Sequence, residues 1–472
     1  AAEALAEGVL NVAPNGRVLV VAGKGNNGGD GLAAARILRD RGRDVDVVAT
    51  CAPEDWIGDS AEMMKLLTGH RPMAISGADG DYSCVVDCLL GTGASGAPRG
   101  KVLDAIDLIN TLAGNGSVVV SCDIPSGVNA STGEVQGTAV RADVTVTFHA
   151  MKPGLWIRPG KGFAGAVTLA DIGIPNSVDV EASVGLIKES VVLTLPRRAE
   201  ADDKFSVGSV TVLGGSPGLT GAPMLAALGA ARAGAGYVTA ALPKALLAAS
   251  DAQLEVMGLG LTDEDGSHCA EGVAEVASRS GAGRALVLGP GLGRSTQAQA
   301  AVRAVVEQAE GPVVVDADGL NAFAQSPALL AETNAELVLT PHVGEIAALL
   351  GRQRDEIEEA RLQSALDLSA LAKAVVVLKG DDTLVATPDG QIAVSEGNAP
   401  ALATAGSGDV LSGVIGALLA RGAEAFQAAC AGVLIHLEAG RLAAGDGLEG
   451  VIAGDIAAAL PAGRKRLETA DR

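Results

Sequence analysis

Short apolar runs alternate with helix-like segments along the first part of the chain. In the segment at 32–39, apolar residues recur with the spacing of one helix face. Strands that alternate with helices are joined by crossover connections, so the pattern predicts a mostly parallel sheet with helices on both faces. The expected strands are 17–22, 45–49, 84–90, 117–123, 143–148 and 165–169.

A second alternation of the same kind follows a polar and charged stretch at 196–204. It includes a hairpin pattern at 383–395, and apolar positions with a period of about 3.6 residues predict a helix at 408–420. We therefore expect two α/β domains, at 1–198 and 199–472. The expected strands of the second domain are 208–213, 236–241, 285–289, 312–316, 337–340 and 374–379.

Composition narrows the choice of partners. The chain has 472 residues, of which 48% are apolar, so each domain can bury its own core. A formal net charge of −21 argues against nucleic acid or an anionic membrane surface as a partner. There is no run of about 20 apolar residues that would predict a membrane span. The six scattered cysteines form no CxxC pair, which favours a reducing, cytoplasmic location.

A glycine-rich segment, Gly23–Gly31, follows the first expected strand and precedes a helix that we expect to begin at Leu32. Glycines let backbone N–H groups approach a ligand, and a helix N-terminus favours an anion, so the segment predicts a phosphate cradle. The spacing of Gly23, Gly25 and Gly28 is that of dinucleotide-binding loops, with a tight packing turn as the alternative. The second strand ends without the acidic residue that binds ribose in ordinary dehydrogenases, which argues against hydride transfer.

Two further loops follow strands of the first domain, at 91–96 and 123–127. Ligands of open parallel sheets bind outside the carboxyl ends of the strands, so we expect these loops to meet the glycine-rich segment there. Asp123 ends its strand beside this position, where a carboxylate can transfer protons. A turn-forming aspartate is the alternative.

Asp87 lies within an apolar strand of the same domain, and a buried carboxylate needs a partner. Oxygen atoms of Asn27, Asp87 and Ser126 would suit a hard cation better than they would suit zinc. A structural hydrogen bond to a neighbouring loop explains Asp87 equally well.

In the second domain, Gly406–Asp409 leads directly into the amphipathic helix. Free N–H groups at this helix N-terminus would form an anion hole, and Asp409 at its mouth could take the proton of a hydroxyl that attacks a phosphoryl group. An ordinary aspartate near a helix start is the alternative. His342, which also follows a strand, could bind a ligand or cap a helix. Other glycine-rich or polar loops follow strands at 214–222, 289–293, 340–345 and 379–383.

Together these motifs resemble those of the bifunctional NAD(P)H-hydrate repair enzymes, over nearly the whole chain and in the family's domain order. The first domain is similar to the NAD(P)H-hydrate epimerase domain, a Rossmann-like three-layer α/β/α fold, and we expect it to be truncated at its N-terminus. The second is similar to the ADP-dependent (S)-NAD(P)H-hydrate dehydratase, a ribokinase-like α/β fold. The resemblance is carried by Gly25–Gly31, Asp87, Gly91–Gly93, Asp123–Gly127, Thr220–Ala222, Gly289–Gly293, Pro341-His342, Lys379–Thr383 and Gly406–Asp409.

The resemblance implies a role for each matching position. Asp123 and Asp409 would be catalytic, and Asn27, Asp87 and Ser126 would bind potassium. The hydrated coenzyme would be bound in the first domain by Asn26, Asn27, Gly28, Gly29, Asp30, Gly91, Thr92, Gly93, Ala94, Ser95, Gly96, Ala97 and Asp123, and in the second by Ala222, Gly291, His342 and Asp409. The adenine nucleotide would be bound by Lys379, Gly380, Asp381, Asp382, Thr383 and Gly408.

The implied activity has two parts. The first domain would interconvert the R and S forms of hydrated NADH or NADPH with K⁺ bound, and the second would dehydrate the S form while ADP and Mg²⁺ are used and AMP and phosphate are released. We expect a cytoplasmic homo-oligomer. Two other functions stay open. One is an ATP-dependent kinase for a small vitamin or sugar alcohol, with an accessory dinucleotide-binding domain. The other is a dinucleotide sensor without catalytic activity.

Overall fold

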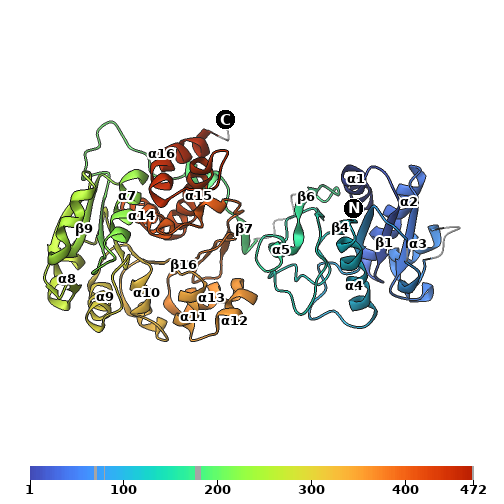
Figure 1. Cartoon of the computed structure of the whole chain (residues 1–472), viewed down its shortest axis with the longest axis horizontal. Helices are drawn as coiled ribbons and strands as arrows, with labels where there is room; N and C mark the ends of the chain where they lie inside the picture. Colours follow the sequence, from blue (N-terminus) through green and yellow to red (C-terminus); the bar gives the residue numbers. More distant parts are fainter. Residues whose placement is uncertain (68–71, 79, 176–181, 470–472) are drawn as a thin grey trace. The chain divides into compact units, whose positions relative to one another are not determined.

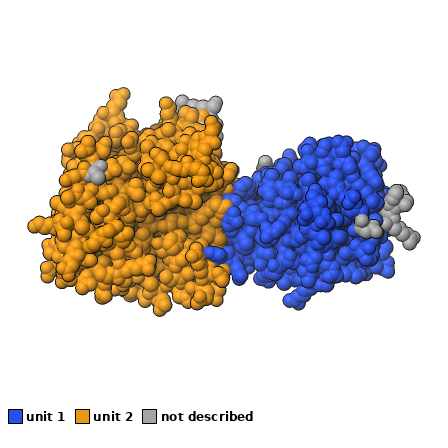
Figure 2. Space-filling view, in the orientation of Figure 1, with its two compact units in different colours: residues 1–181, 358–360 blue, residues 182–357, 361–472 orange. Residues whose placement is uncertain are grey.

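The computed structural model describes residues 1–67, 72–78, 80–175 and 182–469. The chain forms two compact units, one of residues 1–181 with 358–360 and the other of 182–357 with 361–472 (Figure 2). The sequence places the boundary later, at 198/199. Residues 184–186 join the second unit because they form a strand, β7, that pairs with β18 (Ile392–Val394).

The described part of the first unit contains a six-stranded, wholly parallel sheet in the order β2-β1-β3-β4-β5-β6. All six predicted strands are confirmed, with ends that differ by at most two residues. The strands are β1 (Val18–Ala22), β2 (Val45–Ala49), β3 (Cys84–Cys88), β4 (Val118–Cys122), β5 (Val144–Phe148) and β6 (Ala166–Ala170). The helices are α1 (Ala2–Val12), α2 (Asn26–Asp40), α3 (Gly58–Leu66), α4 (Lys101–Gly114) and α5 (Lys161–Ala164), with 3-10 turns at Pro53–Asp55, Ile75–Gly77 and Pro153–Leu155.

Alternate residues of each central strand enter different cores. Val18 and Val20 face the helices α1 to α3, whereas Leu19 and Val21 face α4, and all four side chains are fully buried. A parallel strand covered on both faces must be apolar throughout, which explains the uninterrupted apolar runs in the sequence. The first unit is therefore a three-layer α/β/α structure, as predicted (Figure 1).

The described part of the second unit contains a ten-stranded sheet in the order β10-β9-β8-β13-β14-β15-β16-β17-β18-β7. It is parallel from β10 to β16 and antiparallel across the hairpin of β17 and β18. The predicted strands and the hairpin are confirmed. The strands are β7 (Val184–Leu186), β8 (Ser209–Leu213), β9 (Tyr237–Pro243), β10 (Met257–Leu261), β13 (Arg284–Leu288), β14 (Val313–Val315), β15 (Leu337–Leu339), β16 (Val375–Leu378), β17 (Leu384–Ala386) and β18 (Ile392–Val394), with β11 (Asp263–Glu264) and β12 (Ser267–His268) paired separately.

Helices cover this second sheet, and α14 packs closely on α7 (Figure 1). It also contacts β13 and β8. The apolar side chains of α7 and α14 join those of α15 and α16 in one core. The helices are α6 (Ser190–Leu193), α7 (Gly221–Ala233), α8 (Ala270–Ala277), α9 (Thr296–Gln308), α10 (Asp318–Asn321), α11 (Val343–Leu350), α12 (Arg354–Glu359), α13 (Arg361–Ala372), α14 (Ser407–Ala420), α15 (Ala425–Ala444) and α16 (Ala453–Thr469), with 3-10 segments at Lys244–Ala252, Pro327–Glu332 and Pro400–Leu402. No described helix has both the length and the apolar character needed to cross a bilayer.

The first glycine-rich segment differs from the prediction. Helix α2 begins at Asn26 rather than at Leu32, so most of this segment is helical. The glycines serve close packing here. A Cβ on Gly28 would lie 1.7 Å from the carbonyl oxygen of Gly23, and one on Gly31 would lie 2.7 Å from Cys88 Sγ. The low helix propensity of glycine hid this start, because packing against the sheet outweighs propensity.

Candidate functional site

The carboxyl ends of the strands in the first unit border a pocket of about 850 Å³. The three loops expected to meet do meet there, which confirms their predicted clustering. The predicted ligand-binding residues that line the pocket are Asn26, Asn27, Asp30, Gly91, Thr92, Gly93, Ala94 and Asp123. Gly28 and Gly29 are buried in helix packing instead, and Ala97 lies outside the lining.

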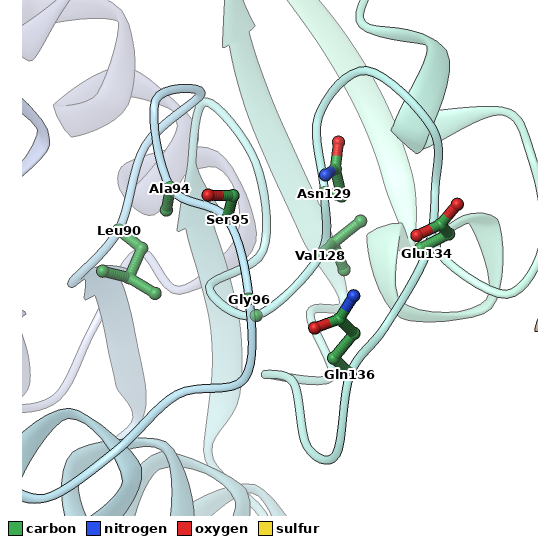
Figure 3. A pocket seen from close by; sticks show the side chains of 9 residues that line it. Leu90, Ala94, Ser95, Gly96, Val128, Asn129, Glu134 and Gln136 are labelled. Atoms are coloured by element: carbon green, nitrogen blue, oxygen red, sulfur yellow. The ribbon is translucent and has the colours of Figure 1, made fainter.

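A second pocket lies between the loop at 94–96 and the segment that carries Asn129 and Glu134 (Figure 3). Ser95 and Gly96 border it from this loop, and Asn129, Glu134 and Gln136 border it from the facing segment. Its volume is only about 20 Å³, which accommodates about one water molecule. Because ligand pockets typically measure about 300–1,000 Å³, the larger pocket is the one that can take a coenzyme.

Asp123 is held rigidly at the wall of the larger pocket. Its backbone has a φ of 69°, a left-handed conformation that is unfavourable for a residue other than glycine. One carboxylate oxygen, Oδ1, accepts hydrogen bonds from Lys152 Nζ at 2.6 Å, from Thr147 Oγ1 at 3.1 Å and from the Phe148 N–H at 3.3 Å. Within the described part of the chain, no donor is found for Oδ2. The second oxygen is therefore left to act on a ligand.

Lys152 was missed by the sequence reasoning. It follows β5 and lies 29 residues from Asp123, in a segment that carries no glycine-rich motif. Its ammonium also donates to the Phe148 carbonyl at 2.7 Å, and its side chain is only 17% exposed. A lysine that bonds both to a carbonyl and to Asp123 fixes the direction of the carboxylate. An isolated lysine after a strand gives no signal from which this contact could have been predicted.

The three oxygen-bearing residues expected at a cation form one connected group. Asp87 is fully buried on β3, and its carboxylate accepts hydrogen bonds from Ser126 Oγ at 2.6 Å and from Ser121 Oγ at 2.9 Å. The Leu90 N–H donates to Ser126 Oγ, and Asn27 Nδ2 donates to the Leu90 carbonyl. Burial raises the pKa of Asp87, and the hydrogen bonds from Ser126 and its other neighbours offset part of this effect.

This group fits a monovalent or other hard cation. No cationic side chain among the described residues forms an ion pair with Asp87, so a bound cation would compensate a carboxylate that is otherwise desolvated. The donors are oxygen atoms, which such cations prefer. The hydrogen bonds from Ser121 and Ser126 also satisfy the alternative structural role, so both roles of Asp87 fit the geometry.

In the second unit, Asp316 and Lys379, which directly follow β14 and β16, meet Glu345 of α11 beside the N-terminus of α14. Lys379 Nζ lies 2.8 Å from Asp316 Oδ1 and 3.7 Å from Glu345 Oε2. A Cβ built on Gly408 would lie 3.5 Å from the same ammonium, which places Lys379 beside the first turn of α14. Burial lowers the pKa of Lys379, but Asp316, Glu345 and Asp409 outweigh burial, so the pKa is raised.

Asp409 occupies the first turn of α14 at the edge of this cluster. Burial, followed by the charge of Asp316, raises its pKa to about 7, whereas Lys379 opposes the rise. A carboxyl group with such a pKa can accept a proton near neutral pH and release it again. Asp316 comes from the end of β14 and was missed, because its sequence neighbourhood shows only a buried strand that ends in an acid.

The two histidines near this cluster make structural contacts. His342 caps α11: its Nδ1 accepts hydrogen bonds from the N–H groups of Gly344 and Glu345. His342 therefore caps a helix, as one of the two alternatives predicted. Its side chain is still 60% exposed and can contact a ligand. His436 Nε2 of α15 lies 3.1 Å from Ser407 Oγ. Burial lowers the pKa of His436 to about 4, so its ring is neutral at pH 7.

The remaining expected contacts of the second unit fall into two groups. Gly291 and Ala222 lie side by side, since a Cβ on Gly291 would be 3.2 Å from the Ala222 Cβ. Thr383 Oγ1 donates to the Gly380 carbonyl at 2.6 Å, which closes the loop of Lys379 to Thr383. The Asp382 carboxylate is paired with Arg361 at 2.9 Å, and both side chains are at least 95% buried. Asp382 can therefore meet a nucleotide only through its backbone.

The Arg361–Asp382 pair gives a prediction for stability. Arg361→Met removes the cation that pairs with this buried carboxylate at 2.9 Å and should lower the free energy of unfolding by about 3–5 kcal/mol. Denaturant unfolding of the second unit measures this effect. The control is Arg352→Met, whose partner Asp367 is more exposed, and it should cost at most about 1 kcal/mol. Equal unfolding midpoints for the two variants would contradict the prediction.

Comparison with known proteins gives matches to both units. A family model described as NAD(P)H-hydrate dehydratase matches residues 210–462, and one described as YjeF-related protein N-terminus matches residues 1–154. The bifunctional NAD(P)H-hydrate repair enzyme of Moorella thermoacetica is 38% identical over 96% of this chain and 88% of its own length. The enzyme of the same name from Coxiella burnetii is 36% identical over 93% of this chain and 88% of its own length.

The second unit also resembles a solved structure. The ADP/ATP-dependent NAD(P)H-hydrate dehydratase from Bacillus subtilis, co-crystallised with ATP and Mg²⁺, matches with a TM-score of 0.53 and 29% identity, over 60% of this chain and 99% of that one. This likeness confirms the expected ribokinase-like α/β fold. The two-part match does not favour the alternative of a small-molecule kinase. The chain belongs to the family of bifunctional NAD(P)H-hydrate repair enzymes.

Proposed function

We propose that residues 1–198 interconvert the R and S forms of hydrated NADH or NADPH, and that residues 199–472 dehydrate the S form while converting ADP to AMP and phosphate. The observation that carries this proposal is the presence of two separate carboxylates, Asp123 and Asp409, each beside the carboxyl ends of parallel strands in its own unit. Ligand sites of such sheets lie at this end. Two sites with one coenzyme as shared substrate also explain why both units belong to one chain.

The dehydration proposed for the second unit replaces a poor leaving group by a good one. Asp409 takes the proton of the ring hydroxyl as the hydroxyl oxygen attacks the β-phosphoryl group of ADP, which forms an O–P bond and releases AMP. N–H groups at the start of α14 stabilise the negative charge that develops. Phosphate then leaves with the C–O electron pair, and loss of a ring proton restores the dihydropyridine. Ala222, Gly291 and His342 would hold the hydrate, and the Lys379–Thr383 loop and Gly408 would hold the nucleotide.

The first unit would supply the S form. Inversion of the ring carbon that carries the hydroxyl requires one of its bonds to break and to re-form on the other face. Asp123 Oδ2 would take the hydroxyl proton as the C–N bond opens to an aldehyde, with its electron pair passing to the ring nitrogen, and would return the proton when the ring closes on the opposite face. Asn27, Asp87 and Ser126 would hold K⁺, which would fix the loop at 90–91 behind the substrate. In the second unit, the described residues contain no group of three metal-ligating side chains. Mg²⁺ would therefore be held largely by the ADP phosphates.

The raised pKa of Asp409 predicts the pH dependence of dehydration. The carboxylate form is the active base, so kcat/KM for the S hydrate should fall about tenfold for each pH unit below about 7 and level off above it. Rates measured across this range, with an enzyme-free blank at each pH, test the expectation. The groups that face Asp409 are Asp316, Lys379, Glu345 and Asp318. A rate that stays constant down to pH 5 would show that Asp409 is not the base.

The whole proposal is tested with a mixture of hydrate epimers and ADP. Full recovery of the reduced-nicotinamide absorbance requires both activities, whereas recovery of the S fraction alone would overturn the epimerase assignment. A stable phosphorylated hydrate would indicate a kinase, and binding without turnover would indicate a sensor. We also propose a cytoplasmic location, because reduced nicotinamide coenzymes are used there. The expected homo-oligomer is tested by light scattering.

A further inference from the structure

The larger pocket of the first unit has two regions of different charge. Asp30 and Asp123 lie near each other: burial raises the pKa of Asp30, and the charge of Asp123 adds to this rise. The only cationic side chains among the described residues that line the pocket are Lys24 and Lys101. Neither belongs to an ion pair in the described part of the chain. Two unpaired ammonium groups facing a pocket are therefore available to a ligand.

The surroundings of Cys51 indicate where in the pocket these two lysines lie. It lines the same pocket just after β2. Burial, with a contribution from Asp55, raises the pKa of the Cys51 thiol, and Lys24 and Lys101 both oppose the rise. Both ammonium groups thus lie close enough to influence the same thiol, although one precedes α2 and the other begins α4. The Asp55 carboxylate lies there too, so this region carries two positive charges against one negative charge.

The sheet order separates this region from Asp123. Cys51 follows β2 and Asp123 follows β4, and β1 and β3 lie between these strands. Three strand spacings correspond to about 14 Å. A nicotinamide ring at Asp123 would therefore leave the rest of a dinucleotide to extend along the strand ends toward Cys51. The part of the coenzyme that carries negative charge is its diphosphate.

We propose that Lys24 and Lys101 form a subsite for the diphosphate of the hydrated dinucleotide, next to Cys51. The inference rests on the proposed epimerase function for the identity of the ligand. Two ammonium groups match the two negative charges of a diphosphate, and lysine binds phosphate as a point charge. In a chain of net charge −21, these groups also offset the general repulsion of an anionic substrate.

Kinetics test the subsite through the substrate. Lys24→Met and Lys101→Met should each raise KM for hydrated NADH in the epimerase reaction about tenfold, with kcat unchanged. Neither should change KM for the hydrated nicotinamide riboside, which has no phosphate. Lys65→Met is the matched control, since Lys65 is paired with Glu62 on α3 outside the pocket lining. Equal effects on both substrates, or no effect on either, would overturn the proposal.

Alkylation of Cys51 gives a test that does not depend on epimerase activity. ADP-ribose carries the diphosphate but no nicotinamide, and it should slow the reaction of Cys51 with iodoacetamide in the full chain. Cys269, which is partly exposed in the second unit, is followed in the same digest by mass spectrometry as the reference. Protection should weaken about tenfold in either lysine variant. Protection that is unchanged by both substitutions would overturn the subsite, whereas lysine-dependent protection without epimerase activity would overturn only the function.

Discussion

Asp409→Asn should abolish ADP-dependent recovery of NAD(P)H from the S hydrate, with kcat lowered roughly 10²–10⁴-fold. An amide has nearly the shape of the carboxylate but cannot take the hydroxyl proton. The substitution also removes a buried negative charge beside Asp316 and Glu345, so the fold of the second unit should be kept. Single-turnover assays with the purified S epimer and ADP measure the loss.

Two controls separate this chemical effect from misfolding. Asp446→Asn changes an exposed carboxylate of the second unit and should leave the rate unchanged. Epimerase activity of Asp409→Asn should also stay at the level of the unchanged protein, because Asp409 belongs to the other unit. If the dehydration rate of Asp409→Asn stays within a factor of about three of the rate of the unchanged protein, Asp409 is not the general base.

Asp123→Asn should lower epimerisation by a similar factor, roughly 10²–10⁴-fold, and leave dehydration of the pure S form intact. Its Oδ1 position can still accept from Thr147 and Phe148, but Lys152 loses its anionic partner and Oδ2 is replaced by a group that cannot accept a proton. With a mixture of epimers and ADP, only the S fraction should return to NAD(P)H within the assay.

The control for Asp123→Asn is again a carboxylate outside the pocket lining. Asp107→Asn alters an exposed residue of α4 and should recover both epimers. Chromatographic separation of R and S hydrates over time follows the exchange directly. Rapid exchange in Asp123→Asn would assign the proton transfer to another group, and Asp30, its acidic neighbour in the pocket, would be examined next.

The glycine-rich motif at 23–31 was recognised from the sequence, but its local structure was predicted wrongly. The segment at 23–31 was expected to be a loop, but it becomes helical at Asn26 because Gly28 lets α2 approach the backbone of Gly23. Strands β7 and β10 were not predicted for a related reason. Both include glycine, and a short apolar run interrupted by glycine gives little strand signal until a neighbouring strand pairs with it.

The amino-acid sequence by itself determined most of the strands, the presence of two α/β units and the positions of the loops that border each site. These features follow from local periodicity, since a buried parallel strand must be apolar at every position and a turn must carry residues that permit it. Asp123 and Asp409 could be predicted for the same reason, because each lies at a recognisable strand end or helix start.

Only the tertiary structure decided which charges meet. Lys379 pairs with Asp316, 63 residues away, Arg361 neutralises Asp382, and Lys152 holds Asp123. Such contacts depend on which strands become neighbours in the sheet and on how much water is excluded there. The periodicity of the sequence shows neither the strand neighbours nor the degree of water exclusion. The free energy of a buried charge is set by partners that are distant in sequence and close in space.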